Sequence, residues 1–193
     1  MRTSYPGPLR HEPLALELHN TVYALRGKHM DGLETPEALS AWLDALGDRL
    51  PAAAREADPA RLPEFVALRE AVREVLHAAL EGDRAPAGAL DVVNAAAARA
   101  PVSPRAVAGS RGRLRGEARY HTGDATDVAL AAFAADAIAL LTGPGQQKLR
   151  ACRAPGCILM FLKDHPRRTW CSSTCGNRAR QARHYARARR ERR

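Results

Sequence analysis

The sequence predicts a mainly α protein, in which a helical N-terminal domain is followed by a small C-terminal module. Apolar residues make up 46% of the 193 residues but aromatic residues only 5%, a balance that favours closely packed helices over a β-sandwich. Apolar positions recur at helical spacing along much of residues 14–142. All four cysteines lie between residues 152 and 175. A chain of this length holds one domain of ordinary size and one small appendage.

Two helices are predicted near the start of the chain. Apolar residues lie near one face of a helix from Leu14 to Leu25, and two glycines in residues 26–34 then break the pattern. The second helix has a clear start, because Thr35 can cap it and Pro36 suits its first position. Pro51 ends it. Its apolar stripe consists of Leu39, Trp42, Leu43, Leu46 and Leu50.

Two more helices follow, over about residues 63–80 and 86–100. Gly82 stops the first, and Pro101 prevents the second from continuing. Inward positions of the first are Phe65, Val66, Val72, Val75, Leu76 and Leu80, with Arg69, Glu70, Arg73 and Glu74 mostly outward. The second carries Leu90, Val93 and Ala97.

The segment 105–121 differs, because glycines divide it into short pieces that can pair as a hairpin around Ser110 to Gly112. Asp124 then caps a long helix that runs to Thr142. The buried side of this helix is predicted to hold Val128, Ala131, Phe133, Ile138 and Leu141. The Gly-Pro-Gly string at 143–145 closes it, which divides the chain into a domain over residues 1–145 and a module over residues 146–193.

The positive charge is concentrated in the last quarter of the chain. Residues 1–149 carry 17 Lys/Arg against 19 Asp/Glu, whereas residues 150–193 carry 13 against 2. Such a basic end indicates an acidic polymer or surface as its partner, the alternative being a solvated tail. No stretch reaches the roughly 18 consecutive apolar residues of a membrane span, and the first residues lack the apolar part of a signal peptide. We therefore expect a cytoplasmic protein that does not enter a membrane.

The spacing of the cysteines predicts one structural Zn²⁺ held by Cys152, Cys157, Cys171 and Cys175. Pro155 and Gly156 suit a turn that points the first two sulfurs the same way, and the second pair is spaced to share the first turn of a helix. Four thiolates fill the zinc shell, which argues against a catalytic ion. Iron–sulfur ligation, disulfides and a His165 ligand are the weaker alternatives.

The rest of the module is predicted to be a short hairpin and a basic helix. Ile158 to Leu162 and Thr169-Trp170 are interpreted as two short strands, giving a treble-clef-like arrangement, with zinc-ribbon geometry left open. The helix after Cys175 puts Arg180, Arg183, Arg187 and Arg190 on one stripe. It has no apolar face to bury, so we expect it to gain order when phosphates neutralise its charge. Tyr185 can stack on a base or cover the core.

At these residues the chain resembles the bacterial CGNR zinc-finger family, named for the string Cys175-Gly176-Asn177-Arg178. The resemblance covers residues 149 to about 187 and includes both cysteine pairs, Arg167-Arg168 and Trp170-Cys171-Ser172. It implies DNA binding through the finger, with contacts expected from Arg167, Arg168, Asn177, Arg178, Arg180, Arg183, Arg187 and Arg190.

The family's N-terminal domain, termed ABATE, is mostly helical and belongs to stress-induced transcription regulators. Here the resemblance rests on residues 14–21 and on the stretch around Trp42. It implies a sensing or dimerising role, with a candidate ligand pocket at His19 and Asn20. The family tends to have an apolar residue where His19 stands.

The leading hypothesis is a transcription regulator that binds duplex DNA, with a homodimer and a small-molecule effector both left open. RNA or ribosome binding by the same basic surface is the first alternative. The second is a ligand sensor or interaction scaffold whose basic tail only tethers it. An enzyme is not expected, because the chain has no nucleophile motif, phosphate loop or spaced carboxylate pair.

Overall fold

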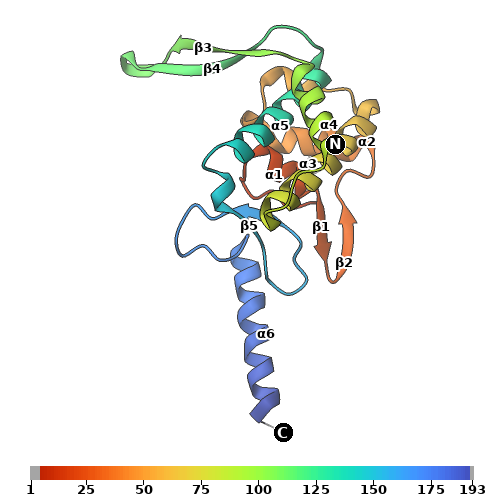
Figure 1. The fold of residues 1–193 in the computed structure, drawn as a ribbon, viewed down its shortest axis with the longest axis vertical. Coiled ribbons are helices and arrows are strands. Elements are labelled where there is room, and N and C mark those ends of the chain that lie inside the picture. The colour runs from red at the N-terminus through yellow and green to blue at the C-terminus, as the bar shows by residue number, and fades with distance from the viewer. Residues whose placement is uncertain (1–4, 192–193) are drawn as a thin grey trace.

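The computed structural model describes residues 5–191 and shows a helical body with two projections at opposite ends (Figure 1). The projections are the hairpin β3–β4 (Val102–Ala108 and Leu114–Tyr120) and the C-terminal helix α6 (Ser173–Glu191). The other helices are α1 (Leu14–His19), α2 (Pro36–Leu46), α3 (Leu62–Glu81), α4 (Ala87–Ala98) and α5 (Ala125–Thr142). The other strands are β1 (Val22–Leu25), β2 (Lys28–Asp31), β5 (Leu149–Ala151) and β6 (Met160–Leu162). Short 3₁₀ turns lie at Gly47–Arg49, Ala52–Glu56, Pro59–Arg61, Ser110–Gly112 and Gln146–Lys148.

Helix α5 is the centre of the core, with α1, α3 and α4 packed against it. Phe133 stacks on Trp42 at 5.0 Å between ring centroids and meets the edge of Phe65 at 6.4 Å. Alanine is frequent on α5, so neighbouring helices approach it closely on more than one side. The helix is long and apolar enough to cross a membrane, but its position inside the described fold is that of a buried core helix.

The predicted start and stop signals of the middle helices are confirmed. Thr35 accepts a hydrogen bond from the backbone N–H of Ala38 at 3.2 Å, and Pro36 is the first residue of α2. This helix ends at Leu46. A 3₁₀ turn follows it, and Leu50 at the end of that turn is buried in the core. Asp124 accepts from the N–H of Asp127 and caps α5 in the same way.

The prediction that Arg69 faces outward is wrong. Its side chain is buried on α3 and forms a bidentate pair with Asp31, at 2.6 and 2.8 Å. Burial acts to raise the pKa of Asp31, but the hydrogen bonds from Arg69 and the Leu33 N–H, together with the charges of Arg69 and Arg73, outweigh it and hold that pKa below its ordinary value. The pair fixes the end of β2 on α3, a tertiary contact that helical periodicity alone cannot reveal.

The predicted helix from Leu14 to Leu25 is wrong in its second half. Helix α1 ends at His19, and Val22 to Leu25 instead form β1, paired antiparallel with β2. Arg26 and Gly27 form the two-residue turn, both with positive φ (50° and 80°), the conformation of a type I′ hairpin. Val22 and Tyr23 are residue types that favour strands, so the apolar spacing that suggested a helix also fits a short hairpin.

The hairpin predicted around Ser110 to Gly112 is confirmed, and it starts earlier, at Val102. Helix α4 lies within the predicted range, with Val93 buried as expected. Leu90, which was assigned to its apolar stripe, is instead 39% exposed, because α4 packs through its alanine positions Ala89 and Ala96.

The short sheet of the module pairs different segments from those predicted. Strand β6 includes Phe161, as expected, but its partner is β5 rather than Thr169-Trp170, which lies in a bend. Leu149 and Met160 from this sheet are buried in the main hydrophobic core with the helices. The module therefore packs against the helical domain and shares its hydrophobic core.

Candidate metal centre and nucleic-acid interface

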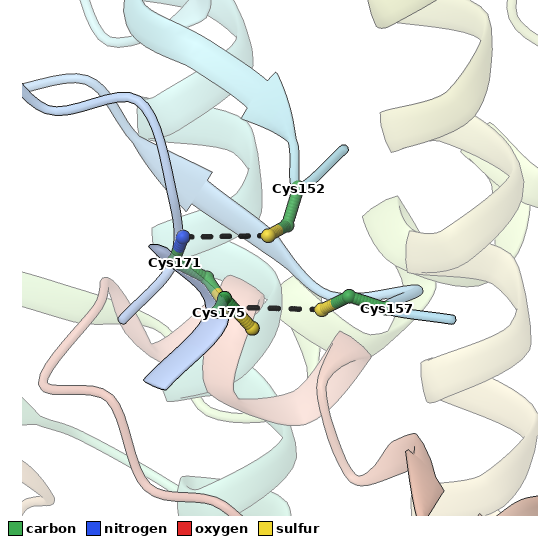
Figure 2. A group of neighbouring side chains, drawn as sticks. All are labelled: Cys152, Cys157, Cys171 and Cys175. Atoms are coloured by element: carbon green, nitrogen blue, oxygen red, sulfur yellow. Dashed lines mark hydrogen bonds between the residues drawn. The ribbon is translucent and has the colours of Figure 1, made fainter. Parts of the chain in front are cut away.

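The four cysteine sulfurs gather at one point beside the start of α6, as Figure 2 shows. Their Sγ atoms all lie within 4.8 Å of one another. The Cys157 and Cys171 sulfurs are 3.8 Å apart, and those of Cys171 and Cys175 are 3.4 Å apart. Cys152, Cys171 and Cys175 are buried and Cys157 is half-buried.

The first cysteine pair is placed by a turn between β5 and β6. The backbone N–H of Cys152 donates to Leu159 O at 2.8 Å, and that of Cys157 donates to Ala154 O at 2.9 Å. Gly156 occupies the turn at φ 68°, a conformation that a residue with a Cβ rarely adopts. The predicted turn around Pro155 and Gly156 is therefore present.

The second pair is placed by the N-terminus of α6. Ser172 accepts a hydrogen bond from the N–H of Cys175 at 3.2 Å, which caps the helix. Cys175 lies in the first turn, and Cys171 lies just before the cap, with its N–H directed at the Cys152 sulfur at 3.5 Å. The helix start and the metal ligands are thus a single local structure.

This geometry fits one zinc ion. Sulfurs at about 2.3 Å from a tetrahedral Zn²⁺ lie roughly 3.8 Å from one another, close to the observed separations. A disulfide requires about 2.05 Å between sulfurs, and the four cysteines are free. An iron–sulfur cluster needs room for several atoms between its thiolates, which sulfurs this close do not leave. His165 is not a ligand, since it lies exposed in the bend and its Nδ1 accepts from Arg167 N.

The ionisation of the four cysteine thiols also favours a bound cation at this site. Hydrogen bonds from Cys157 and Cys171 lower the pKa of Cys152, whereas hydrogen bonds with Cys152 and Cys157 raise the pKa of Cys171 well above its ordinary value. Four adjacent thiols therefore cannot all ionise without a compensating positive charge. Arg178 supplies part of this charge, because its guanidinium donates to the Cys175 sulfur at 3.3 Å.

A small apolar cluster supports the centre. Phe161, Leu159 and Ala154 are buried with the cysteines, and Trp170 packs against them. Gly176 is buried under Trp170, where a Cβ would lie 3.0 Å from the Trp170 ring. The glycine after the last ligand therefore allows the indole to close over the first turn of α6.

Beyond its first turns, α6 projects away from the body (Figure 1). The predicted stripe is exposed: Arg180, Arg183, Arg187 and Arg190 all face solvent. Tyr185 is 72% exposed, so it does not cover the core. The described part of α6 thus offers a cationic helical surface whose base is fixed by the metal ligands.

The other predicted contact residues differ in their surroundings. Arg167 and Asn177 are exposed, and Asn177 accepts a hydrogen bond from Arg180. Arg168 is half-buried: it pairs with Glu12, donates to Leu162 O at 3.0 Å and lies 4.9 Å from the centre of the Phe161 ring. The Arg168 guanidinium therefore joins the module to the N-terminal segment.

His19 and Asn20 lie inside the molecule, which does not fit the ligand pocket expected there. The Asn20 amide is fully engaged with Met160, accepting from its N–H at 2.9 Å and donating to its carbonyl at 3.0 Å. His19 is 1% exposed, and neither ring nitrogen has a hydrogen-bond partner. Burial, with nearby Arg73 and His77, lowers its pKa to about 3, so the ring is neutral.

A cavity of about 770 Å³ lies instead where α3 meets the module. His77 and Glu81 line it from α3, and Phe161 and Trp170 from the module. Four cationic side chains also line it, namely Arg150, Arg153, Lys163 and Arg168. Sequence patterns gave no signal for this cavity or for buried Glu12, because the residues that meet there are far apart in the chain.

Two family profiles match the chain. The profile of the ABATE family, described as "Putative stress-induced transcription regulator", matches residues 12–144. The profile of the CGNR zinc finger matches residues 148–188, which include all four cysteines. A search of curated proteins finds no match. Since the first profile spans more than half of the sequence, the chain belongs to the ABATE family, and it carries a CGNR zinc finger with one structural zinc.

Proposed function

We propose that the protein is a DNA-binding transcription regulator whose zinc centre sets the direction of α6 and whose α6 arginines contact the duplex. The observation that carries this proposal is the exposed cationic stripe of α6, which begins at a metal ligand and points away from the body. Both family descriptions, a transcription regulator and a zinc finger, support it. The protein would act in the cytoplasm by binding, without catalysis.

The dimensions and charge of α6 suit a duplex groove. Its 19 residues make a helix about 28 Å long. The major groove admits a helix, and arginines on it can reach phosphates or the edge of guanine. Because the described part of the stripe stands clear of the body, a duplex can approach it without a change in the fold.

The test is the salt dependence of duplex binding by the zinc-loaded full chain. Arg183→Gln with Arg187→Gln should make the plot of log affinity against log salt shallower by about 2, since each lost phosphate contact removes about 0.9. Arg26→Gln with Arg84→Gln, two exposed arginines on the body, is the matched control and should leave the slope unchanged. A slope unaffected by the α6 pair would refute this role, and preference for structured RNA in competition would favour the RNA alternative.

The cavity between α3 and the module favours a second role, as a receptor for a small anion. Its lining has four cationic side chains against the single carboxylate of Glu81, together with the rings of Phe161 and Trp170, which suits an anionic, planar molecule. Isothermal titration with inorganic phosphate and with nucleoside monophosphates tests this role. Binding that weakens in Arg153→Gln but not in Arg84→Gln would support it, and absence of binding by all of these anions would oppose it.

A further inference from the structure

The hairpin β3–β4 is an arm that extends from the body at the end opposite α6 (Figure 1). Its strands pair antiparallel over seven residue pairs, from Val102–Tyr120 to Ala108–Leu114. Seven residues at 3.3 Å give an arm about 23 Å long. Among the described residues, the arm contacts the core at its base, where half-buried Tyr120 packs against the helices.

The arm has two chemically different faces. Residues that alternate along a strand share a face, and directly paired residues share it across the ribbon. One face is mostly polar and consists of Ser103, Arg105, Val107, Arg115, Glu117 and Arg119. The other face is apolar and made mostly of small residues: Val102, Pro104, Ala106, Ala108, Leu114, Gly116, Ala118 and Tyr120. All but Tyr120 on the apolar face are exposed.

The arm is also the cationic part of an otherwise acidic domain. Residues 102–120 contain five arginines and one glutamate, whereas the rest of residues 1–149 contains 12 Lys/Arg and 18 Asp/Glu. The tip adds Arg111 and Arg113 to the arginines of the polar face. The net charge of residues 1–149 is therefore small because a positively charged arm offsets a negatively charged helical body.

We propose that the β3–β4 arm is a second contact for duplex DNA, so that one chain holds two separate duplex segments, one on the arm and one on α6. Charge complementarity supports this occupant, because a ribbon with five arginines and one acid suits a polyanion. A groove also admits a two-stranded ribbon, and the small residues of the apolar face keep this one thin. The arm contact depends on its own residues, whereas the bridging of two duplexes also rests on the function proposed for α6.

Separation into two duplex segments follows from the placement of the two elements. The arm and α6 leave the body at opposite ends, with the acidic helical domain between them. A short straight duplex bound along α6 therefore does not reach the arm. The protein is expected to bring two duplexes together, in addition to binding one.

A bridging assay tests the inference with the zinc-loaded full chain. One 30-base-pair duplex is fixed to beads, the protein is added, and recovery of a second, fluorescent duplex is measured. Arg105→Gln, Arg113→Gln and Arg119→Gln combined should reduce recovery at least tenfold, while binding to a single duplex through α6 persists. Replacement of the same three residues by lysine should preserve recovery, because lysine keeps the charge that contacts phosphate. The matched control is Arg26→Gln, Lys28→Gln and Arg84→Gln, three exposed cations of the body, which should bridge as the wild type does.

The outcomes separate this inference from the function proposed for α6. Normal bridging by the arm triple variant overturns the inference, and so does absence of bridging by the wild type when the Arg183/Arg187 pair is shown to contribute to duplex affinity. If the arm triple variant lowers duplex affinity while the Arg183/Arg187 pair does not, the arm contact stands, but the role of α6 and the bridging that depends on it both fail. If Leu114→Asp converts a dimer to a monomer in sedimentation and the arm triple still bridges, the apolar face binds a second copy of the chain and the inference is wrong.

Discussion

The side chain of Asn20 satisfies both backbone groups of Met160, a residue 140 positions away in the sequence. Asn20 follows the end of α1 in the ABATE domain, whereas Met160 begins β6 of the zinc finger. Glu12 adds a parallel link, because its carboxylate accepts from the N–H of Leu162 at 2.9 Å and pairs with Arg168. The two family regions are thus joined by buried hydrogen bonds as well as by a common core.

Asn20→Ala should destabilise the protein by about 2–4 kcal/mol, because it leaves the N–H and carbonyl of Met160 buried without partners. Urea unfolding of the zinc-loaded protein measures this change. Asn94→Ala, on the exposed side of α4, is the matched control and should cost less than about 1 kcal/mol. Equal losses for the two variants would contradict the structural role of Asn20.

Asp31→Asn should cost about 2–3 kcal/mol, because it removes the bidentate charged partner of the buried Arg69 guanidinium and leaves Glu70 as its one carboxylate partner among the described residues. The control is Asp48→Asn, which breaks the exposed pair with Arg55 and should change the free energy of unfolding by less than about 1 kcal/mol. Thermal unfolding of both variants provides the measurement. A loss at Asp31 no larger than that at Asp48 would show that the Glu70 carboxylate alone is enough to stabilise the buried Arg69 charge.

His19 should make stability depend on pH. Its pKa in the folded state is lowered to about 3, first by burial and then by Arg73 and His77, from an ordinary value of 6.5. The unfolded chain therefore binds a proton below pH 6.5 that the folded protein excludes. Protonation of His19 in the unfolded chain therefore costs the protein nothing above pH 6.5. Below that pH it lowers the free energy of unfolding by about 1.4 kcal/mol per pH unit, down to about pH 3.

His19→Leu removes this contribution and should flatten the dependence of unfolding free energy on pH between about 6.5 and 4.5. Urea midpoints across this range measure the slope. His29→Leu, at an exposed position of β2, should retain the slope of the wild type. An unchanged slope in His19→Leu would mean that the buried ring is not the group that titrates on unfolding.

Removal of zinc should separate specific DNA binding from charge-driven binding. Cys175→Ser, or chelation of the wild type, should abolish the single bound zinc and lower the melting temperature by several degrees, since metal binding contributes to folding. The arginines remain, so weak binding with steep salt dependence should persist. Thr174→Ser, at an exposed position beside the ligand, should keep both zinc and specific binding. Specific binding by the metal-free protein would show that zinc does not orient α6.

Features set by short-range chemistry could be predicted from the sequence. The Thr35 and Asp124 caps, the turn around Ser110 and the zinc ligands all depend on residues a few positions apart, or on a residue type with few alternative uses. The CGNR string then gave the family. These signals were enough to anticipate the mainly α fold and the metal centre.

The contacts that join the two regions could not be predicted in this way. Apolar spacing near Val22 fits both a helix and a hairpin, and only the pairing with Lys28–Asp31 decides between them. Leu149 and Met160 are both buried in the core formed by the helices, and the local sequence gives no sign of this contact. Arg69, Glu12 and Asn20 are polar residues whose burial depends on partners 38 to 156 positions away.

Because α6 is attached to the protein at the zinc centre, a small tilt at its base produces a larger displacement of its far end. The base of the helix is held by ligands whose strands β5 and β6 pack into the ABATE core, while its far end is free of contacts with the body over the described residues. A rigid rod about 28 Å long that tilts by about 10° at its base moves its tip by roughly 5 Å, close to one helical turn. Small rearrangements among the packed helices would therefore move the far end of α6 far enough to change which groups of a bound partner its arginines contact.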